Sequence, residues 1–378
     1  MAGEVLCDSE IKELIVNGAI KNADANLVNP SSLDLRLGKQ ARRLLGCGLP
    51  MHGQMIEALL LNKEYVDTVV EDIGHRFYLE ANQLYLFNLV ESLELPKGIS
   101  ARVFNKSGRG RIGTSVRTIC DGMPYFDNVP QMYGGHLFAE VSATAFPELI
   151  TPGETAMPQI RFYDGTPEAL KGLALKVLLE QDPVLLDKNG KPIEFSRKDL
   201  DNICDSGVLS FSADFSGEFL AYRARKERKN IDLSKKDEYL PEDFFEEVKP
   251  KGKERSLVVH PGDFYLIHSM ERIRLNPRMA AEIAEHSTEL GDMKSHYAGL
   301  INCGHGYEQG KLTGANIVFE VRARDSPILI QHGQKIALFN LYKMSKAPEI
   351  KYSQVQSTGF YCLASILPTQ FKKKEKKE

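Results

Sequence analysis

The residues best suited to chemistry are concentrated in a short loop, Asn105–Gly113, which reads Asn-Lys-Ser-Gly-Arg-Gly-Arg-Ile-Gly. Glycine lets backbone N–H groups approach a ligand closely, and the planar guanidinium of arginine matches phosphate oxygens in a bidentate way. The loop therefore predicts a polyphosphate site made by Lys106, Ser107, Arg109 and Arg111. The spacing is not that of a Walker loop, and a solvated basic turn is the alternative.

Glu140 is the candidate for acid–base chemistry. In His136–Ser142, strand alternation places Glu140 on one face together with Phe138. Apolar and aromatic neighbours raise the pKa of a carboxyl toward the range that is useful for proton transfer. The alternative is a solubilising charge on an edge strand. Glu320, in Asn316–Arg322, has the same phase and is an alternative or additional acid–base residue.

Strands must position both groups. From Arg76 to Tyr163, short apolar runs alternate with Gly, Pro and Asn turns, which is typical of a β domain. A half-buried strand is expected at Ser32–Gly38, where leucines alternate with polar residues. Helices are few and short: one is expected to be capped by Asp8, and another to open at Thr166–Pro167.

The second half of the chain repeats the first at one ungapped offset of 180 residues, which pairs Tyr85-Leu86 with Tyr265-Leu266 and Glu140-Val141 with Glu320-Val321. A repeat of this length indicates a duplicated domain and not a solenoid. We therefore expect a first β domain with the phosphate loop and Glu140, a helical and hairpin connector, a second β domain, and a closing segment with a disordered Lys/Glu tail. Their predicted ranges are 1–165, 166–205, 206–345 and 346–378.

The two copies differ where the loop matters. Arg109 aligns with Glu289, so the second loop is acidic and would repel a triphosphate. The second copy instead carries a Gly-rich segment, His296–Tyr307, which is either a base pocket or an ordinary β-turn. We therefore expect the copies to divide the labour. Fewer than two nucleotides should bind per chain, with Glu140 essential and Glu320 less important.

Composition excludes other classes of protein. The formal net charge of −3 argues against a general nucleic-acid binder, and no apolar run is long enough to span a membrane. The N-terminal residues do not resemble a secretory signal, and the six scattered cysteines are typical of reduced thiols. A cytoplasmic protein with no nucleic-acid or membrane partner is expected.

Five motifs in this order resemble the dCTP deaminase branch of the dUTPase-like superfamily, most closely its longer, duplicated bacterial form. Gly135 and Glu140 match a Gly-x-x-x-x-Glu strand that carries the catalytic glutamate of that family. The other four motifs resemble its opening helix, first strand, phosphate loop and C-terminal closing segment, in that order: Leu6–Ile11, Pro30–Gly38, Lys106–Gly113 and Lys351–Ser357.

The resemblance implies a mainly β protein with two tandem dUTPase-like domains of β-barrel or jelly-roll type and a few short helices. It implies hydrolytic deamination of dCTP to dUTP and ammonia, with Glu140 as proton shuttle and Mg²⁺ bound through the triphosphate. A homotrimer is expected by the same analogy, and dTTP is a candidate inhibitor whose effect the sequence leaves open. The implied base and sugar contacts, followed by the closing residues, are Asp121, Ala298, Gly299 and Asn302, then Lys351, Tyr352, Gln354 and Gln356.

The sequence departs from the family pattern at two positions, and two rival functions remain. The first copy has no clean Ile-Asp-Pro-Gly hairpin, and Asn302 stands where the family and dUTPases have aspartate. The H-x-E and P-C-x-x-C motifs of zinc deaminases are absent, so no zinc is expected. A dUTP diphosphatase or a bifunctional deaminase-diphosphatase is the rival enzyme, and a dNTP-binding regulator is the non-enzymatic rival.

Overall fold

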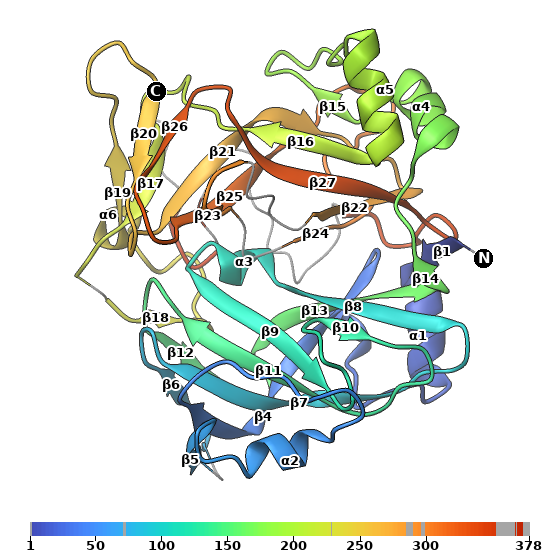
Figure 1. Ribbon diagram of the computed structural model, residues 1–378, viewed down its shortest axis with the longest axis vertical. Coiled ribbons are helices and arrows are strands. Elements are labelled where there is room, and N and C mark those ends of the chain that lie inside the picture. Colours follow the sequence, from blue (N-terminus) through green and yellow to red (C-terminus); the bar gives the residue numbers. More distant parts are fainter. Residues whose placement is uncertain are drawn as a thin grey trace.

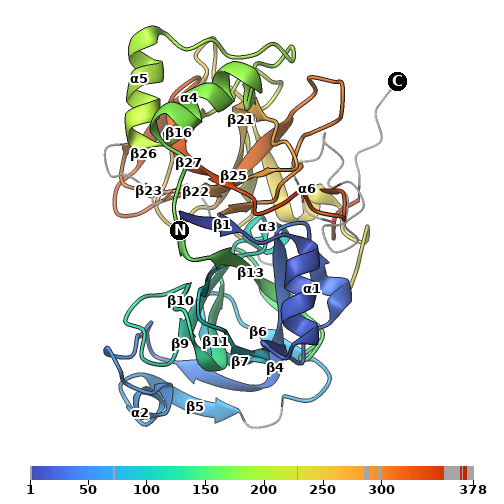
Figure 2. The same cartoon turned by 90° about the vertical axis from the view of Figure 1, so that its right-hand side faces the viewer.

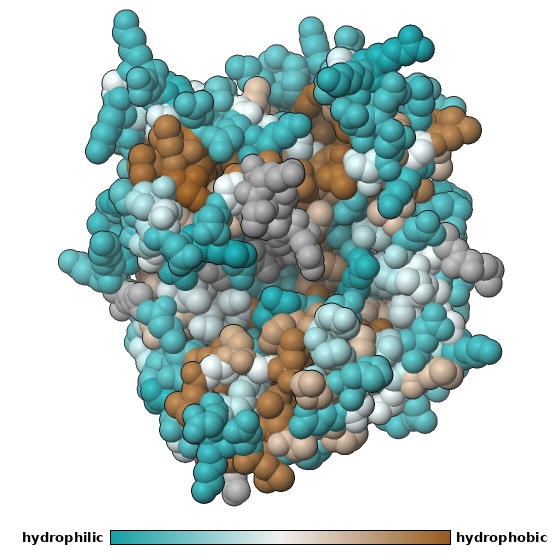
Figure 3. All heavy atoms as spheres, viewed as in Figure 1, coloured by the Kyte–Doolittle hydropathy of each residue, from teal (hydrophilic) through white to brown (hydrophobic). Residues whose placement is uncertain are grey.

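The computed structural model describes residues 2–70, 73–227, 229–284, 290–295, 299–352, 367 and 369–372. Two β-rich lobes lie one above the other, with the first half of the chain in the lower lobe and most of the second half in the upper one (Figure 1). Turning the molecule shows α1 beside the lower lobe, and α4 and α5 at the far end of the upper one (Figure 2). In the space-filling view hydrophilic residues cover most of the face, and apolar residues form separate patches on both lobes (Figure 3).

The first lobe contains long antiparallel strands and short helices. Its elements are β1 (Ala2–Val5), α1 (Asp8–Val16), β2 (Ile20–Lys21), η1 (Ala25–Leu27), β3 (Val28–Asn29), β4 (Ser32–Leu44), α2 (Ile56–Leu60), β5 (Val66–Val70), β6 (Phe77–Leu79), β7 (Leu84–Glu94), β8 (Ile99–Asn105), α3 (Ser107–Gly110), β9 (Thr114–Cys120), β10 (Asn128–Val129), β11 (Gly134–Ala143), β12 (Glu148–Ile150), β13 (Ala156–Asp164) and β14 (Thr166–Pro167). Its main sheet has the strand order β10-β8-β13-β4-β7-β11-β9.

The rest of the chain forms a connector and the second lobe. Its elements are α4 (Gly172–Gln181), β15 (Leu185–Leu186), α5 (Arg197–Ser206), β16 (Val208–Ser212), β17 (Ala221–Ala224), β18 (Ile231–Asp232), α6 (Pro241–Phe244), β19 (Phe245–Val248), β20 (Ser256–Val259), β21 (Tyr265–Ile273), β22 (Met279–Ile283), β23 (Met293–Lys294), β24 (Leu300–Ile301), β25 (Ala315–Ala323), β26 (Ile328–Gln331) and β27 (Lys335–Lys343). The two larger sheets have the orders β19-β17-β21-β25-β23 and β16-β27-β22-β24.

The duplication is visible in the strand register. In the first copy Leu86 of β7 lies opposite Glu140 of β11, and in the second copy Leu266 of β21 lies opposite Glu320 of β25. Because strand pairing fixes which face each side chain takes, both glutamates have equivalent places in their sheets. The predicted class, mainly β with few short helices, is confirmed.

The lobes are not packed as two separate units. Strand β18 runs parallel to β12 of the first lobe, with Ile231 opposite Glu148. Phe244 and Phe245, which the sequence placed in the second domain, also pack into the hydrophobic core of the first lobe. Phe371, from the C-terminal segment 346–378, joins the same core.

Three local expectations need correction. The helix expected at Thr166–Pro167 begins at Gly172, because Thr166 and Pro167 pair with β1 instead. Cys7, and not Asp8, caps α1. The polar face of β4 is not solvated: Ser32 and Asp34 are fully buried, since that face packs against Asn302 and Lys106.

Two expectations about composition can be compared with the described residues. Cys7, Cys47, Cys120, Cys204 and Cys303 are free thiols, and Cys362 lies outside the described residues. Within the described ranges, no helix has the length and apolar character needed to cross a membrane.

Candidate active site

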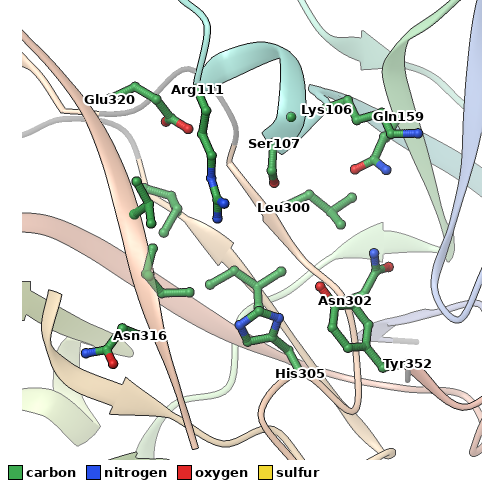
Figure 4. Close-up of a pocket in the computed structure, with 15 residues that line it drawn as sticks. Lys106, Ser107, Arg111, Gln159, Leu300, Asn302, His305, Asn316, Glu320 and Tyr352 are labelled. Carbon is green, nitrogen blue, oxygen red and sulfur yellow. The ribbon is translucent and has the colours of Figure 1, made fainter. Parts of the chain in front are cut away.

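A pocket lies where the phosphate loop of the first lobe faces the second lobe, and it gathers side chains from both copies (Figure 4). The first lobe contributes α3 and β13. The second lobe contributes the end of β22, the β24 hairpin, part of β25 and the start of the C-terminal segment. The polar lining residues are Lys106, Ser107, Arg111, Gln159, Asn302, His305, Asn316, Glu320 and Tyr352.

The phosphate loop forms a single helical turn, α3, directly after strand β8. The loop ends at Gly113, which has a φ of +79°. A Cβ at this position would lie 2.5 Å from the Cβ of Ala145, so the tight turn requires glycine. Arg111 extends from α3 into the pocket, between Glu320 and Ser107 (Figure 4). Arg109 does not line the pocket, because its Nε donates to the backbone carbonyl of Ala156 at 3.3 Å.

Lys106 is held by a buried acid at the edge of the pocket. Its Nζ pairs with Oδ2 of Asp34, and Gln159 donates to Oδ1 of the same carboxylate at 2.6 Å. Asp34 therefore fixes both Lys106 and Gln159 at the pocket wall. Asp34 partly neutralises the positive charge of Lys106. Among the described lining residues, Arg111 is the other cationic side chain.

The opposite wall is the hairpin predicted as a base pocket. Asn302 lines the pocket, and its Oδ1 accepts from the hydroxyls of Ser31 at 2.7 Å and Ser32 at 3.2 Å. Gly299 lies beside the lining residue Leu300 and accepts a backbone bond from Ile283 at 2.7 Å. Ala298 lies outside the described residues.

Glu320 is the carboxylate of this pocket. It is 2 % exposed, and it shares its face of β25 with the lining residue Val318. Lys294 lies on the neighbouring strand β23, where burial and the charge of Arg117 lower its pKa to about 8 while Glu320 acts in the opposite direction. Glu320 is therefore buried, and its charge acts on the half-buried cation Lys294.

His305 and Tyr352 close the lower end of the pocket (Figure 4). Their ring centroids are 5.0 Å apart with the planes at 65°. Burial and the charge of Arg111 lower the pKa of His305 to about 4, so this imidazole is neutral near pH 7. The segment before Tyr352 is anchored by Asp8, which accepts from the backbone N–H groups of Glu349 and Ile350, at 2.9 Å each. The closing residue Lys351 does not line the pocket, and Gln354 and Gln356 are outside the described ranges.

Comparisons with known proteins decide the family. Residues 2–166 match the family "2'-deoxycytidine 5'-triphosphate deaminase, N-terminal domain", and residues 181–366 match the C-terminal domain of the same enzyme. The chain belongs to the dCTP deaminase family. It is similar along nearly its whole length to the crystal structure of 2'-deoxycytidine 5'-triphosphate deaminase from Agrobacterium tumefaciens, at 29 % identity and a TM-score of 0.81, over 93 % of this chain and 98 % of that one.

Curated relatives agree with this family. The enzyme "dCTP deaminase, dUMP-forming" of Methanosphaera stadtmanae is 24 % identical over 53 % of this chain and 97 % of its own length. The protein of the same name from Methanobrevibacter smithii is 27 % identical over 40 % of this chain and 75 % of its own length. The chain is therefore an enzyme of deoxynucleotide metabolism in the dCTP deaminase family.

In this dCTP deaminase family member, Glu140 lies outside the pocket and is covered by its own lobe. Its Oε1 accepts from the backbone N–H of Gly48 at 2.9 Å and from the hydroxyl of Tyr65 at 2.8 Å. Burial raises the pKa of Glu140, in the direction expected from its apolar neighbours. Glu140, whose pKa is raised, is thus covered by the segment 45–65.

The same segment also covers the first-copy hairpin. Asp121 accepts from the backbone N–H of Ile56 at 2.7 Å, and Gly122 exchanges backbone bonds with Gly53 and Gln54. Asp121, predicted as a base or sugar contact, does not line the pocket. In this dCTP deaminase family member, the position in the first copy that corresponds to the pocket is filled by protein.

Sequence reasoning missed Gln159 and Asn316, which line the pocket. A signal for Gln159 was present in β13, an otherwise apolar strand in which Gln159 and Arg161 share one face. Buried polar side chains on one face of a strand need hydrogen-bond partners. Gln159 finds Asp34, and Arg161 finds Glu282. Across the ranges that the structure describes, no group of three or more His, Cys, Asp or Glu side chains could hold a metal ion.

Proposed function

We propose that the chain deaminates dCTP to dUTP and ammonia at the pocket between its two lobes, with Glu320 as the acid–base residue. The observation that supports this most is the convergence of three groups in one pocket. Lys106, Ser107 and Arg111 come from the first copy, and Asn302 and Glu320 come from the second. Cations with a hydroxyl match a triphosphate, the hairpin provides contacts for the nucleoside, and the buried carboxylate is suited to proton transfer.

In the proposed reaction Glu320 accepts a proton from water as the water oxygen forms a bond to C4 of cytosine. The same carboxyl passes this proton to ring nitrogen N3 and then accepts the second proton of the water from the hydroxyl formed at C4. It delivers that second proton to the leaving amino group as the C4–N bond breaks and the C4 carbonyl forms, and ammonia departs. One water is consumed, so dCTP and water yield dUTP and ammonia. The sequence favoured Glu140 for this role, with Glu320 as the alternative or additional residue. We propose Glu320 instead, because Glu140 accepts from Gly48 and Tyr65 and does not line the pocket. The role of Glu140 stays an untested prediction.

The chain's residues bind the triphosphate directly. Arg111 and Lys106 supply positive charge, and Ser107 supplies a hydroxyl at the start of α3. Mg²⁺ is proposed to enter bound to the phosphates, where it neutralises part of their charge. The donors of this wall, two cations and a hydroxyl, suit phosphate oxygens better than a bare metal ion. Tyr352 and the segment after it are proposed to close over the nucleotide.

A second product is favoured by the names of relatives. Several are named "dCTP deaminase, dUMP-forming", which supports a bifunctional reaction in which dUTP is further cleaved to dUMP. Asn302 weighs against it, because dUTPases use an aspartate at this position to orient the hydrolytic water. We therefore propose dUTP as the main product and dUMP as the alternative.

The test is to incubate the pure protein with dCTP and Mg²⁺ and to separate dCTP, dUTP and dUMP by anion-exchange chromatography. Accumulation of dUTP supports the proposal, and dUMP formed without accumulated dUTP supports the bifunctional alternative. Unchanged dCTP, together with tight binding of dCTP, would identify a regulator. Glu320→Gln is the control for a contaminating deaminase. Adding dTTP tests whether it inhibits, and measuring mass by light scattering tests the trimer expected from the family resemblance.

A further inference from the structure

A fully buried arginine joins the two lobes beside the pocket. Arg161 of β13 is 0 % exposed and uses all five of its N–H donors. Its Nε donates to the carbonyl of Ser31 at 3.3 Å, and Nη1 donates to the carbonyl of Ala281 and to Oε1 of Glu282, both at 3.0 Å. Its Nη2 donates to Oγ of Ser31 at 3.2 Å and to the carbonyl of Ile301 at 2.9 Å.

Two of these bonds lead to the pocket wall. Ile301 precedes Asn302, and the Ser31 hydroxyl that accepts from Arg161 also lies 2.7 Å from Oδ1 of Asn302. The guanidinium has no acceptor atom and stays protonated, so Ser31 accepts from it and directs its own hydrogen toward Asn302. The relay therefore fixes both the backbone and the side chain of the hairpin.

The direction of the relay determines which atom Asn302 offers to a ligand. Oδ1 accepts from Ser31 and Ser32, so the Nδ2 group is the one that can donate into the pocket. Two hydroxyl donors, from Ser31 and Ser32, converge on this end of the amide and favour the orientation in which Oδ1 faces the serines. The hairpin then selects an acceptor atom on the nucleoside, such as a carbonyl or hydroxyl oxygen.

A second arginine provides a matched comparison. Arg102 of β8 also crosses the lobe boundary and donates to Glu282, at 3.0 Å to Oε2. Its Nη1 also donates to the hydroxyl of Tyr342 at 3.1 Å, and its hydrogen bonds within the described residues do not reach Ile301, Ser31 or Asn302. Arg102 and Arg161 thus share the same carboxylate, but only Arg161 is bonded to the hairpin.

We infer that Arg161 is a positioning residue that, through Ser31 and Ile301, holds Asn302 so that its Nδ2 donor faces the nucleoside in the pocket. The inference rests on the proposed function for the identity of the ligand. Arg161 contacts no lining side chain that would bind phosphate, so its effect is expected on nucleoside recognition and not on the phosphate loop.

The experiment compares Arg161→Lys and Ser31→Ala with the controls Arg102→Lys and Ser100→Ala, the last removing a hydroxyl that donates to Gly165 within the first lobe. KM and kcat for dCTP are measured together with the affinity for inorganic triphosphate by calorimetry. Loss of one neutral hydrogen bond in Ser31→Ala should raise KM about 5-fold. Lysine cannot reproduce the five-donor fork, so Arg161→Lys should raise KM about 10-fold or more. Triphosphate affinity should stay within about 2-fold of wild type in both, because neither side chain contacts the phosphate loop.

A readout that does not need catalysis separates this inference from the proposed function. With ¹⁵N-asparagine labelling, the side-chain amide signals of Asn302, assigned by their loss in Asn302→Ser, should shift in Ser31→Ala and Arg161→Lys but not in Arg102→Lys. Unshifted signals, equal effects of Arg102→Lys and Arg161→Lys, or a matching loss of triphosphate affinity would overturn the positioning role. Shifted signals in a protein that does not turn over dCTP would refute the proposed function and leave the positioning role in place.

Discussion

Glu140 and Glu320 occupy equivalent strand positions in different surroundings, so replacing each by glutamine tests which copy carries the chemistry. Glutamine is nearly isosteric with glutamate but cannot shuttle protons at neutral pH. Glu320 lines the pocket with Arg111 and Asn302, whereas Glu140 accepts from Gly48 and Tyr65. Glu320→Gln should therefore lose deamination while still binding dCTP, and Glu140→Gln should retain it.

The magnitudes follow from these contacts. A positioned acid–base group contributes roughly 10²–10⁴-fold to a rate, so Glu320→Gln should reduce kcat by at least about 100-fold. In Glu140→Gln the amide oxygen can still accept from Gly48 and Tyr65. Two charge-assisted bonds become neutral ones, and this costs about 1–3 kcal/mol of folding stability at most. The kcat of this variant should stay within about 3-fold of wild type, because the contacts it weakens do not reach the pocket.

The assay is the initial rate of product formation from saturating dCTP, with the melting temperature of each variant measured alongside to exclude unfolding. Calorimetry on Glu320→Gln checks that the pocket still binds dCTP. A Glu140→Gln protein with less than a tenth of wild-type kcat, beside a Glu320→Gln protein with more than a tenth, would refute the reasoning. That result would return the chemistry to Glu140, as the sequence motif predicts.

Three further predictions test other parts of the site and the fold. Arg111→Ala should weaken binding of dCTP by about 1.5–3 kcal/mol and of dCMP much less, while Arg109→Ala should have the smaller effect; equal losses for dCTP and dCMP would contradict this reading of the loop. Calorimetry with a non-hydrolysable dCTP analogue should give one nucleotide per chain, and two equal sites would show that the first-copy position also binds. Burial raises the pKa of Glu148 from 4.5 to about 7, so the stability from its protonated form is complete below about pH 4.5 and is lost as the pH rises through 7. Glu148→Gln should remove this pH dependence of stability, which amounts to about 3 kcal/mol. Equal slopes of melting temperature against pH for the variant and the wild type would contradict this role of Glu148.

The fold was predictable because its signals are local and repeated. Alternation in short segments predicts strands, and the offset of 180 residues predicts that both halves use the same strand pairing. The registers of Glu140 with Leu86 and of Glu320 with Leu266 follow from that pattern. The loop residues Lys106, Ser107 and Arg111 line the pocket, and their role in phosphate binding stays a prediction from a local cluster of glycine and cationic residues.

The composition of the pocket was harder to predict, because it depends on contacts between distant segments. Nothing local to Glu140 indicates that Gly48 and Tyr65 will cover it, since these residues lie 92 and 75 positions away along the chain. For the same reason β4 was expected to have a solvated face. Ser32 and Asp34 are buried only because the second lobe and the phosphate loop pack against that face.

The unequal copies follow from fusing two domains into one chain. In a symmetric homo-oligomer every substitution appears at every site, so a copy cannot lose its phosphate loop or its free carboxylate without disabling all sites. In a fused chain each copy changes separately. The first copy keeps Arg111 while its glutamate is bonded to Tyr65, and the second keeps Glu320 in the pocket while Glu289 stands where an arginine aligns. In the proposed site each missing group comes from the other copy, because the pocket combines Arg111 of the first copy with Glu320 of the second.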